Sequence, residues 1–396
     1  MNGEYTIYRR NRTTGIREEL IERYTSFSMT INWGELSSFS IEGATTGTVE
    51  LEEGDGVVFY RNGQYLFSGI VGEVEISCKD VNAGLKEWTA EGKEDSVMFS
   101  RWLAFADPVN ITFNDDINDL TTGYAWNRII YYIRRNMGAD ALVDRKISGL
   151  TLPAAENTGQ NIESSARYNQ LDQLIFDIGN EVDSAGVPNG LQPRFVWNPE
   201  TGAKSVTIEK QRDRTADITI GAEFCNLTSW TKTRTVPTCN AVWAVSGTYD
   251  DNGTDTRLWV SATDPDSITK YGRFEKVVTC SDVSVSDEMT QSEAYALLNV
   301  EARKALQEGA AQDKFSGTMV ETPELRFMTD WICGDLVTCV IDGTSFVTTI
   351  KTVEVEFADG VETVKPTLGE CEHGKFAEIF KELRGLDTRM AKEELN

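Results

Sequence analysis

The residue types that most often carry enzyme chemistry are sparse in this chain. It has one histidine, His373, which lies between Glu372 and Gly374. A Ser-His-Asp or Cys-His relay needs an imidazole that a folded scaffold holds beside the nucleophile, and a glycine-flanked junction is a poor place for one. The glycine-rich dinucleotide motif, the phosphate loop and the His-Glu-x-x-His zinc motif do not occur in the sequence, so these three kinds of site are not supported.

Cysteines are scattered along the chain, and no two of them have the Cys-x-x-Cys spacing of a metal or redox pair. An odd number without paired spacing favours free thiols that are buried as small hydrophobic side chains in a reducing compartment. A disulfide framework or a zinc site is the less favoured alternative. The seven residues are Cys78, Cys225, Cys239, Cys280, Cys333, Cys339 and Cys371.

Acidic side chains are the remaining candidates for chemistry. Residues 250–255 read Asp-Asp-Asn-Gly-Thr-Asp, but the alternating order of a calcium loop and its closing glutamate are missing, so a hairpin tip is favoured. A glycosidase pair is defined by separation in space and not along the chain, so a hydrolase stays as an alternative. From the residues we expect no catalytic site, no metal ion and no cofactor.

Length and composition describe a folded globular chain of two to four domains. It has 396 residues, of which 40% are hydrophobic and 10% aromatic, enough to form sizeable cores. No apolar run approaches the ~20 residues that cross a bilayer, so we expect no membrane anchor. The N-terminus lacks the basic-then-apolar order of a secretory signal, which indicates synthesis in the cytoplasm.

The net charge of −25 at pH 7 repels phosphate and argues against a surface that grips nucleic acid. Such acidity either serves solubility or lines a conduit through which DNA slides without sticking. One stretch is locally basic, with Arg128, Arg134 and Arg135 on a predicted helix. This basic helix is either a salt-bridged surface or a contact with an acidic neighbouring subunit.

The first half of the chain divides into a β-rich and an α-rich part. Residues 1–95 contain five or six short strands, and the apolar alternation around Asn62-Gly63 predicts a type I′ hairpin. Residues 96–190 have helical periodicity instead. We predict helices over Ala125–Met137 and Ile162–Val182, which together form an α-rich insertion.

Residues 191–372 are again β-rich. A hairpin is predicted over residues 192–209, and a capping-box pattern at Thr290 begins a helix at 287–308. Leu325–Gly369 then reads as three antiparallel strands, separated by polar breaks, a pattern that suits the closing strands of a small β-domain.

A Trp-x-x-Gly-Asp corner made by Trp331, Gly334 and Asp335 lies inside that last stretch, and Asp342 and Gly343 form a turn between its strands. Asp-Gly pairs favour the positive φ angles of a hairpin turn. The corner is interpreted as a turn that fixes where a strand enters the barrel, and not as a site of chemistry.

The C-terminal residues 373–396 have apolar side chains at heptad positions. The spacing is that of the a and d positions over two heptads, with Gly385 as a weak point. Two hypotheses follow: the segment is a short coiled coil that forms a trimer seam, or it is an amphipathic helix that docks on its own domain. If the segment self-associates, the interface consists of Phe376, Ile379, Leu383, Leu386 and Met390.

The order of these features resembles the baseplate hub and tail-associated hub proteins of phage tails. The resemblance covers most of the chain, although each motif is loose by itself. The family implies an α+β fold, mainly β, with two small β-barrel tube-like domains, an α-rich insertion and a C-terminal helix. The resemblance rests on Arg23–Trp33, Leu66–Glu75, Glu87–Arg101, Arg194–Arg214, Asn226–Gly247, and the capped helix followed by Phe315-Ser316-Gly317 and Trp331-x-x-Gly334-Asp335.

A hub of this kind is a structural protein of the virion tail, made in the host cytoplasm, with no enzymatic activity. It is a homotrimer whose two barrels per chain form a pseudo-six-fold ring, which continues the tail tube and adapts it to the three-fold tail tip. The implied partners are a distal tail protein or tail tube hexamer, a tape-measure protein, a tail-tip fibre or spike protein, and DNA in transit through an acidic lumen. The alternatives are a tail-associated cell-wall hydrolase and a carbohydrate-binding receptor module that uses exposed tryptophans.

Overall fold

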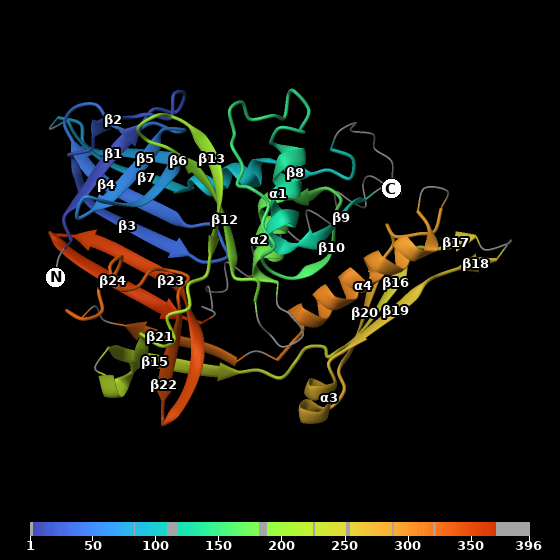
Figure 1. The fold of residues 1–396 in the computed structure, drawn as a ribbon. Coiled ribbons are helices and arrows are strands. Elements are labelled where there is room, and N and C mark those ends of the chain that lie inside the picture. Colours follow the sequence, from blue (N-terminus) through green and yellow to red (C-terminus); the bar gives the residue numbers. More distant parts are fainter. Residues whose placement is uncertain are drawn as a thin grey trace.

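The fold is mainly β, with 47% of residues in strands and 17% in helices. Figure 1 shows a β body built from the first and last parts of the chain, a helix-containing insertion beside it, and an elongated unit that projects from the body. No helix of the described part is long and apolar enough to cross a membrane. The computed structural model describes residues 3–369, apart from residues 83, 109–117, 182–187, 225, 251–253, 287–288, 312 and 320–321.

The N-terminal strands form the blue part of the β body in Figure 1. Their alternating apolar side chains face a common core, as the burial of every second residue in β4 shows. The predicted hairpin at Asn62-Gly63 is confirmed, because both residues have the positive φ angles of a type I′ turn, 52° and 74°. The strands are β1 (Tyr5–Arg10), β2 (Arg17–Leu20), β3 (Tyr24–Asn32), β4 (Ser38–Thr45), β5 (Gly56–Arg61), β6 (Gln64–Asp80) and β7 (Leu85–Glu94).

The C-terminal strands complete the β body. The predicted meander is confirmed, and its two Asp-Gly turns have positive φ angles at Asp342 (49°) and Asp359 (53°). The elements are β14 (Thr219–Gly221), η2 (Ala222–Phe224), β15 (Leu227–Arg234), β21 (Asp313–Met319), β22 (Leu336–Ile341), β23 (Thr344–Ala358) and β24 (Val361–Leu368).

These two sets of strands belong to one sheet of 13 strands, with β14 and β22 lying off its main path. The main path runs β15-β21-β24-β23-β3-β4-β7-β6-β5-β1-β2. Antiparallel pairing of β3 with β23, from Ser26 opposite Ala358 to Asn32 opposite Thr352, joins the beginning of the chain to its end. The largest hydrophobic core accordingly draws its side chains from both sets. No closed barrel is found among the described strands, so the two-barrel arrangement is not confirmed.

The insertion has a second hydrophobic core, formed around α1 and α2. The predicted helix at Ala125 and the predicted hairpin of β12 with β13 are both confirmed. The elements are η1 (Asp95–Arg101), β8 (Leu103–Ala104), β9 (Asp119–Tyr124), α1 (Ala125–Asn136), β10 (Asn161–Ala166), β11 (Asn169–Gln170), α2 (Leu171–Asn180), β12 (Leu191–Trp197) and β13 (Lys204–Lys210).

The predicted helix over Ile162–Val182 is wrong in its first half. The helix α2 covers Leu171–Asn180, whereas Asn161–Ala166 is a strand that pairs antiparallel with β9. Long-range pairing therefore overrides the local helical periodicity, which is weak there because serine is a poor helix former. Tyr168, with φ of 56°, separates the strand from the helix.

The projecting unit, residues 239–309, is called the arm below. The third hydrophobic core of the protein lies in the arm, between the sheet β19-β16-β20 and α4. The predicted capping box at the start of α4 is confirmed by reciprocal hydrogen bonds between Thr290 and Glu293. The predicted hairpin tip at residues 250–255 is confirmed by the pairing of β17 with β18. The elements are β16 (Ala241–Ser246), β17 (Tyr249–Asp250), β18 (Asp255–Thr256), β19 (Trp259–Thr263), α3 (Pro265–Tyr271), β20 (Glu275–Cys280) and α4 (Gln291–Glu308).

Candidate functional site

The predicted corner is built around a buried tryptophan. Trp331 is fully buried, and its ring lies 4.9 Å from that of Phe327, centroid to centroid. Its indole Nε1 donates a hydrogen bond to the carbonyl of Leu325 at 3.2 Å. The tryptophan thus closes the loop that precedes β22, and its polar atom has a partner, as a buried indole requires.

Backbone hydrogen bonds fasten the corner to the middle of β23. The N–H of Gly334 donates to the carbonyl of Ile350 at 2.8 Å, and the N–H of Ile350 donates to the carbonyl of Asp335 at 2.9 Å. Gly334 has a φ of 95°, and a Cβ at this position would lie 2.1 Å from Cε3 of Trp33. The chain can therefore pass this close to the end of β3 because residue 334 has no side chain.

The Asp335 carboxylate accepts hydrogen bonds from an arginine side chain and from the backbone. Its side chain is fully buried and accepts from Nε and Nη2 of Arg212 at 2.7 and 2.6 Å. It also accepts from the N–H of Ile332 at 2.9 Å. The bidentate contact raises the pKa of the Arg212 guanidinium. Asp335 therefore ties the segment that leaves the insertion to the corner of the β body, and the described structure gives it a positioning role.

A second buried cluster, around Glu362, joins the N-terminal strand to β24. Arg61 donates to Glu362 through Nε at 2.7 Å and to the carbonyl of Phe327 through Nη1 at 3.0 Å. The hydroxyl of Tyr5 and the N–H of Gly3 also donate to the Glu362 carboxylate. Burial alone would raise the pKa of Glu362, but these donors outweigh it and leave that pKa below its ordinary value.

We expect the substitution Glu362→Gln to lower the free energy of unfolding by roughly 3 kcal/mol at pH 7, because it leaves buried Arg61 without its anion. A carboxylate with a depressed pKa stabilises the fold above its unfolded pKa, and this stabilisation is lost as the pH falls through the folded pKa. The difference in unfolding free energy between Glu362→Gln and wild type should therefore shrink below pH 4.5, the ordinary pKa of a glutamate side chain.

Urea unfolding at neutral and acidic pH measures this effect. The matched control is Glu356→Gln on the adjacent strand, whose carboxylate is exposed and lies 3.9 Å from Lys365. An exposed pair of this kind contributes little, so the control should match wild type. A pH-independent loss in Glu362→Gln would contradict the assigned role of the charge.

Two more buried ion pairs join the insertion to the β body. Arg10 and Asp95 form a bidentate pair at 2.5 and 2.6 Å. Arg194 of β12 pairs with Glu94 at the end of β7, and with Glu209 at 3.3 Å. Burial raises the pKa of Glu94 despite the positive charge of Arg194. These contacts fix the insertion against the end of the N-terminal strands.

The arginines of the basic helix α1 are engaged in ion pairs within the chain. Arg128 is buried and pairs with Glu181 at 3.1 Å, so it does not reach the surface. Arg135 pairs with Asp119 at 2.9 Å, and the exposed Arg134 pairs with Asp140 at 2.7 Å. The salt-bridged interpretation therefore accounts for the pattern, and a subunit contact at Arg134 or Arg135 stays a prediction.

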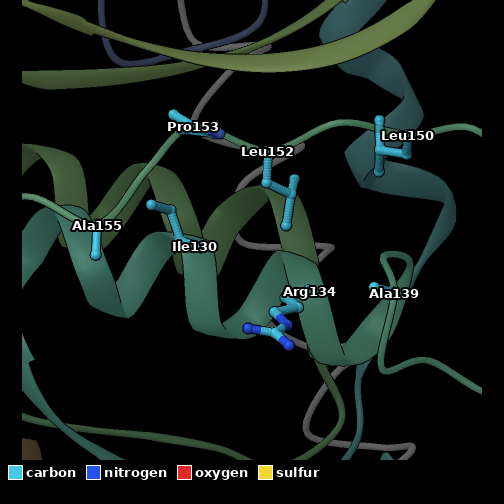
Figure 2. A pocket seen from close by; sticks show the side chains of 7 residues that line it. All are labelled: Ile130, Arg134, Ala139, Leu150, Leu152, Pro153 and Ala155. Atoms are coloured by element: carbon cyan, nitrogen blue, oxygen red, sulfur yellow. The ribbon is translucent and has the colours of Figure 1, made fainter.

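A groove of about 330 Å³ lies beside α1. Figure 2 shows that the helix forms one wall and the extended segment 150–155 the other. The lining is apolar apart from Arg134, and it contains no carboxylate, histidine or thiol that could act on a substrate. The lining residues are Ile130, Arg134, Ala139, Leu150, Leu152, Pro153 and Ala155.

Other candidates for chemistry are dispersed. No three His, Cys, Asp or Glu side chains of the described residues gather as a metal site. The thiols of Cys239, Cys280, Cys333 and Cys339 are buried, which confirms the interpretation as small hydrophobic side chains for these four. Burial raises the pKa of the Cys333 thiol to about 12. His373 and the whole predicted apolar face from Phe376 to Met390 lie outside the described residues.

The sequence pattern did not reveal the two residues that anchor the corner and the N-terminus. Arg212 belongs to a stretch that carries the resemblance, but nothing in its neighbourhood indicates Asp335 as its partner. Glu362 looks like an ordinary polar residue of an alternating strand. One signal was present: Arg61 ends the otherwise apolar strand Gly56–Arg61, and a buried arginine needs a paired anion.

Three solved structures share this fold along nearly the whole chain. The tail protein from Neisseria meningitidis MC58 superposes with a TM-score of 0.52 at 15% identity, over 92% of this chain and 96% of that one. The prophage MuSo2 tail protein from Shewanella oneidensis superposes with a TM-score of 0.54 at 9% identity, over 93% of this chain and 98% of that one. A prophage tail protein from Listeria monocytogenes EGD-e superposes with a TM-score of 0.50 at 12% identity, over 96% of this chain and 99% of that one. The fold is therefore that of phage tail proteins.

The family model for the Siphovirus ReqiPepy6 Gp37-like protein matches residues 6–370, so the chain belongs to that family. No curated protein matches the sequence. The chain is a structural protein of the phage tail or baseplate, and it is located in the virion tail. The resemblance seen in the sequence is thereby confirmed.

Proposed function

We propose that this tail protein is the baseplate hub, a homotrimer that forms a pseudo-six-fold ring, continues the tail tube and adapts it to the three-fold tip. Three chains that each present two similar β faces imitate six subunits, which solves the mismatch between six-fold and three-fold neighbours. The observation that carries the proposal is the presence of two sets of strands in one chain, one from each end of the chain, paired through β3 and β23.

The second set of strands supports a barrel because a side chain bridges its open seam. Its order is β15-β21-β24-β23-β22-β14, so β15 and β14 are the two ends. Asn226, just before β15, donates through Nδ2 to the carbonyl of Thr219 and accepts from the N–H of Gly221, both at 2.9 Å. These bonds hold the start of β15 beside β14, so the two ends of the set lie next to each other.

The first set of strands curls in a comparable way. Its order is β3-β4-β7-β6-β5-β1-β2, and the ring of Tyr5 on β1 lies 4.8 Å from that of Phe27 on β3, centroid to centroid. Strands β3 and β1, which are not neighbours in the sheet, therefore meet through aromatic side chains at the shared core. The ion pair of Glu362 on β24 with Arg61 on β5 also joins the two sets, which supports their acting as one unit in such a ring.

The charge of the chain fits a conduit. A net charge of −25 would keep DNA from adhering to the lumen of the ring. The proposed neighbours are a distal tail protein or tail tube hexamer on one side and a tail-tip fibre or spike protein on the other. The tape-measure protein is a further proposed partner, at the lumen of the ring. The proposed role in the virion is structural, without catalysis.

Measurement of the mass in solution tests the proposal. Residues 1–396 should sediment as a trimer, and a chain ending at residue 372 should remain a trimer if the β body makes the ring contacts. Loss of the trimer in the shorter chain would instead assign the contact to a seam at Phe376, Ile379, Leu383, Leu386 and Met390. A monomer in both dilute and concentrated solution would count against the hub, and clearing of cell-wall material in zymography would favour the hydrolase.

A further inference from the structure

One face of the arm's sheet carries large apolar side chains that the described residues leave exposed. On the other face, α4 packs against β16, β19 and β20 and forms the third core. Trp243, Trp259 and Val277 are 37%, 55% and 58% exposed. The register places Val277 opposite Trp243, and Trp259 opposite the neighbouring Val245, so these side chains share one face. Two exposed tryptophans on one face of a sheet are typical of a binding surface.

The central strand has the composition of a strand that is covered on both sides. Ala241–Ser246 reads Ala-Val-Trp-Ala-Val-Ser and pairs in parallel with β20. Strands in parallel pairs are usually buried on both faces and are then apolar at successive positions, whereas a half-exposed strand alternates. Strand β16 therefore has the sequence of a strand in the middle layer of a three-layer unit, and a helix is the usual third layer.

We propose that the C-terminal segment of the same chain, residues 375–392, docks as a helix on the exposed apolar face of the arm's sheet. Its side chains Phe376, Ile379, Leu383, Leu386 and Met390 would cover Trp243, Trp259 and Val277. This inference chooses the docked helix over the trimer seam for these residues, and it does not depend on the hub function, because the contact lies within one chain.

The direction of the chain supports this occupant. Strand β24 runs antiparallel to β21, with Thr367 opposite Thr318. Strand β21 begins at Asp313, directly after the arm, so β24 heads back toward the base of the arm and its last described residue is Gly369. In this register Gly369 lies opposite residue 316, which is ~10 Å along β21 from Asp313. Residues 370–375 can span up to ~20 Å, about twice that distance.

The length and the charge of the segment also match. A helix over residues 376–390 would be ~22 Å long, and a six-residue strand such as β16 is ~20 Å long. Residues 375–392 contain five basic and three acidic residues in a chain whose net charge is −25. The arm contains twelve acidic and six basic residues. The segment is thus a net cation opposite a net anion.

Hydrogen exchange on the full chain tests the contact, with Leu383→Asp as the disrupting variant. Thr388→Asp is the matched control, because it adds the same charge on the opposite side of the predicted helix. We expect Leu383→Asp to speed exchange of the β16, β19 and β20 amides about tenfold, as expected when a stabilising contact is lost locally. Thr388→Asp should leave those rates unchanged, and β23 in the body should keep its rates in both variants.

The reciprocal variant keeps the test decisive. Trp259→Ser should speed exchange in residues 376–390, whereas Trp230→Ser, at a comparably exposed tryptophan of β15, should not. Protection of the arm should be independent of protein concentration, since the contact is intramolecular. Equal arm rates in Leu383→Asp and Thr388→Asp would overturn the proposal and leave the face to a glycan or another tail protein. Protection that falls on dilution would also overturn it, in favour of contact between copies.

Discussion

Replacing Gly334 with alanine is expected to lower the free energy of unfolding by about 3 kcal/mol or more, the sum of overpacking and backbone strain. The new Cβ would lie 2.1 Å from Cε3 of Trp33, and the residue has a φ of 95°. Trp33 cannot move away cheaply, because it is buried in the core that both sets of strands share. The corner would have to shift, and its paired backbone bonds with Ile350 would weaken.

A matched substitution separates the close approach from the backbone angle. Gly343 has a similar φ of 73°, but a Cβ there would meet nothing within 4 Å. Gly343→Ala should therefore cost about 1 kcal/mol, the left-handed strain alone. Midpoints of thermal unfolding of the two variants against wild type give the comparison, and equal losses would show that Trp33 does not constrain the corner.

Removal of Arg212 is expected to be the second large effect. Arg212→Ala leaves the fully buried carboxylate of Asp335 without its cation, which costs about 3 kcal/mol, the lower end of the usual range for a broken buried pair. The lower end applies because the Arg212 side chain is 43% exposed, so that water already screens part of the attraction. Asp335→Ala should cost less, since the released arginine can turn into solvent.

An exposed ion pair provides the control. Arg273 and Glu275 in the arm are 2.7 Å apart, but their side chains are 45% and 56% exposed. Arg273→Ala should leave the urea midpoint unchanged within error, because exposed pairs contribute little. If Arg212→Ala were as mild as Arg273→Ala, the buried carboxylate would have found another partner, and Asp335 would not be the tie between the insertion and the corner.

The local signals in the sequence predicted much of the secondary structure. The turn at Asn62-Gly63, the capped start of α4 and the helix α1 appear where the pattern places them. Each depends on residues a few positions apart, so that propensity and side-chain bonding decide the outcome. The helix predicted over residues 162–170 is wrong because local signals do not show long-range pairing. Part of this segment pairs with β9, about 40 positions away in the sequence.

The candidate site was predictable in its residues but not in its partners. Trp331, Gly334 and Asp335 were identified as a corner, and the structure places them together. Their contacts with Trp33, Arg212 and Ile350 come from distant parts of the chain. Arg128, expected on a contact helix, is buried against Glu181. A charged residue on a helix does not reveal which side will be covered when the insertion folds against its neighbours.

The sequence by itself determined the class of this protein: a mainly β tail component with local turns and caps written in short motifs, an acidic balance and an amphipathic C-terminal segment. Only the tertiary structure decided that β3 pairs with β23, that Glu362 holds the N-terminus, and that Trp243 and Trp259 are exposed on one face of the arm's sheet. The physical reason is that turns and caps are fixed by neighbouring residues. Pairing between distant strands depends instead on how the whole chain closes its loops and buries its apolar surface.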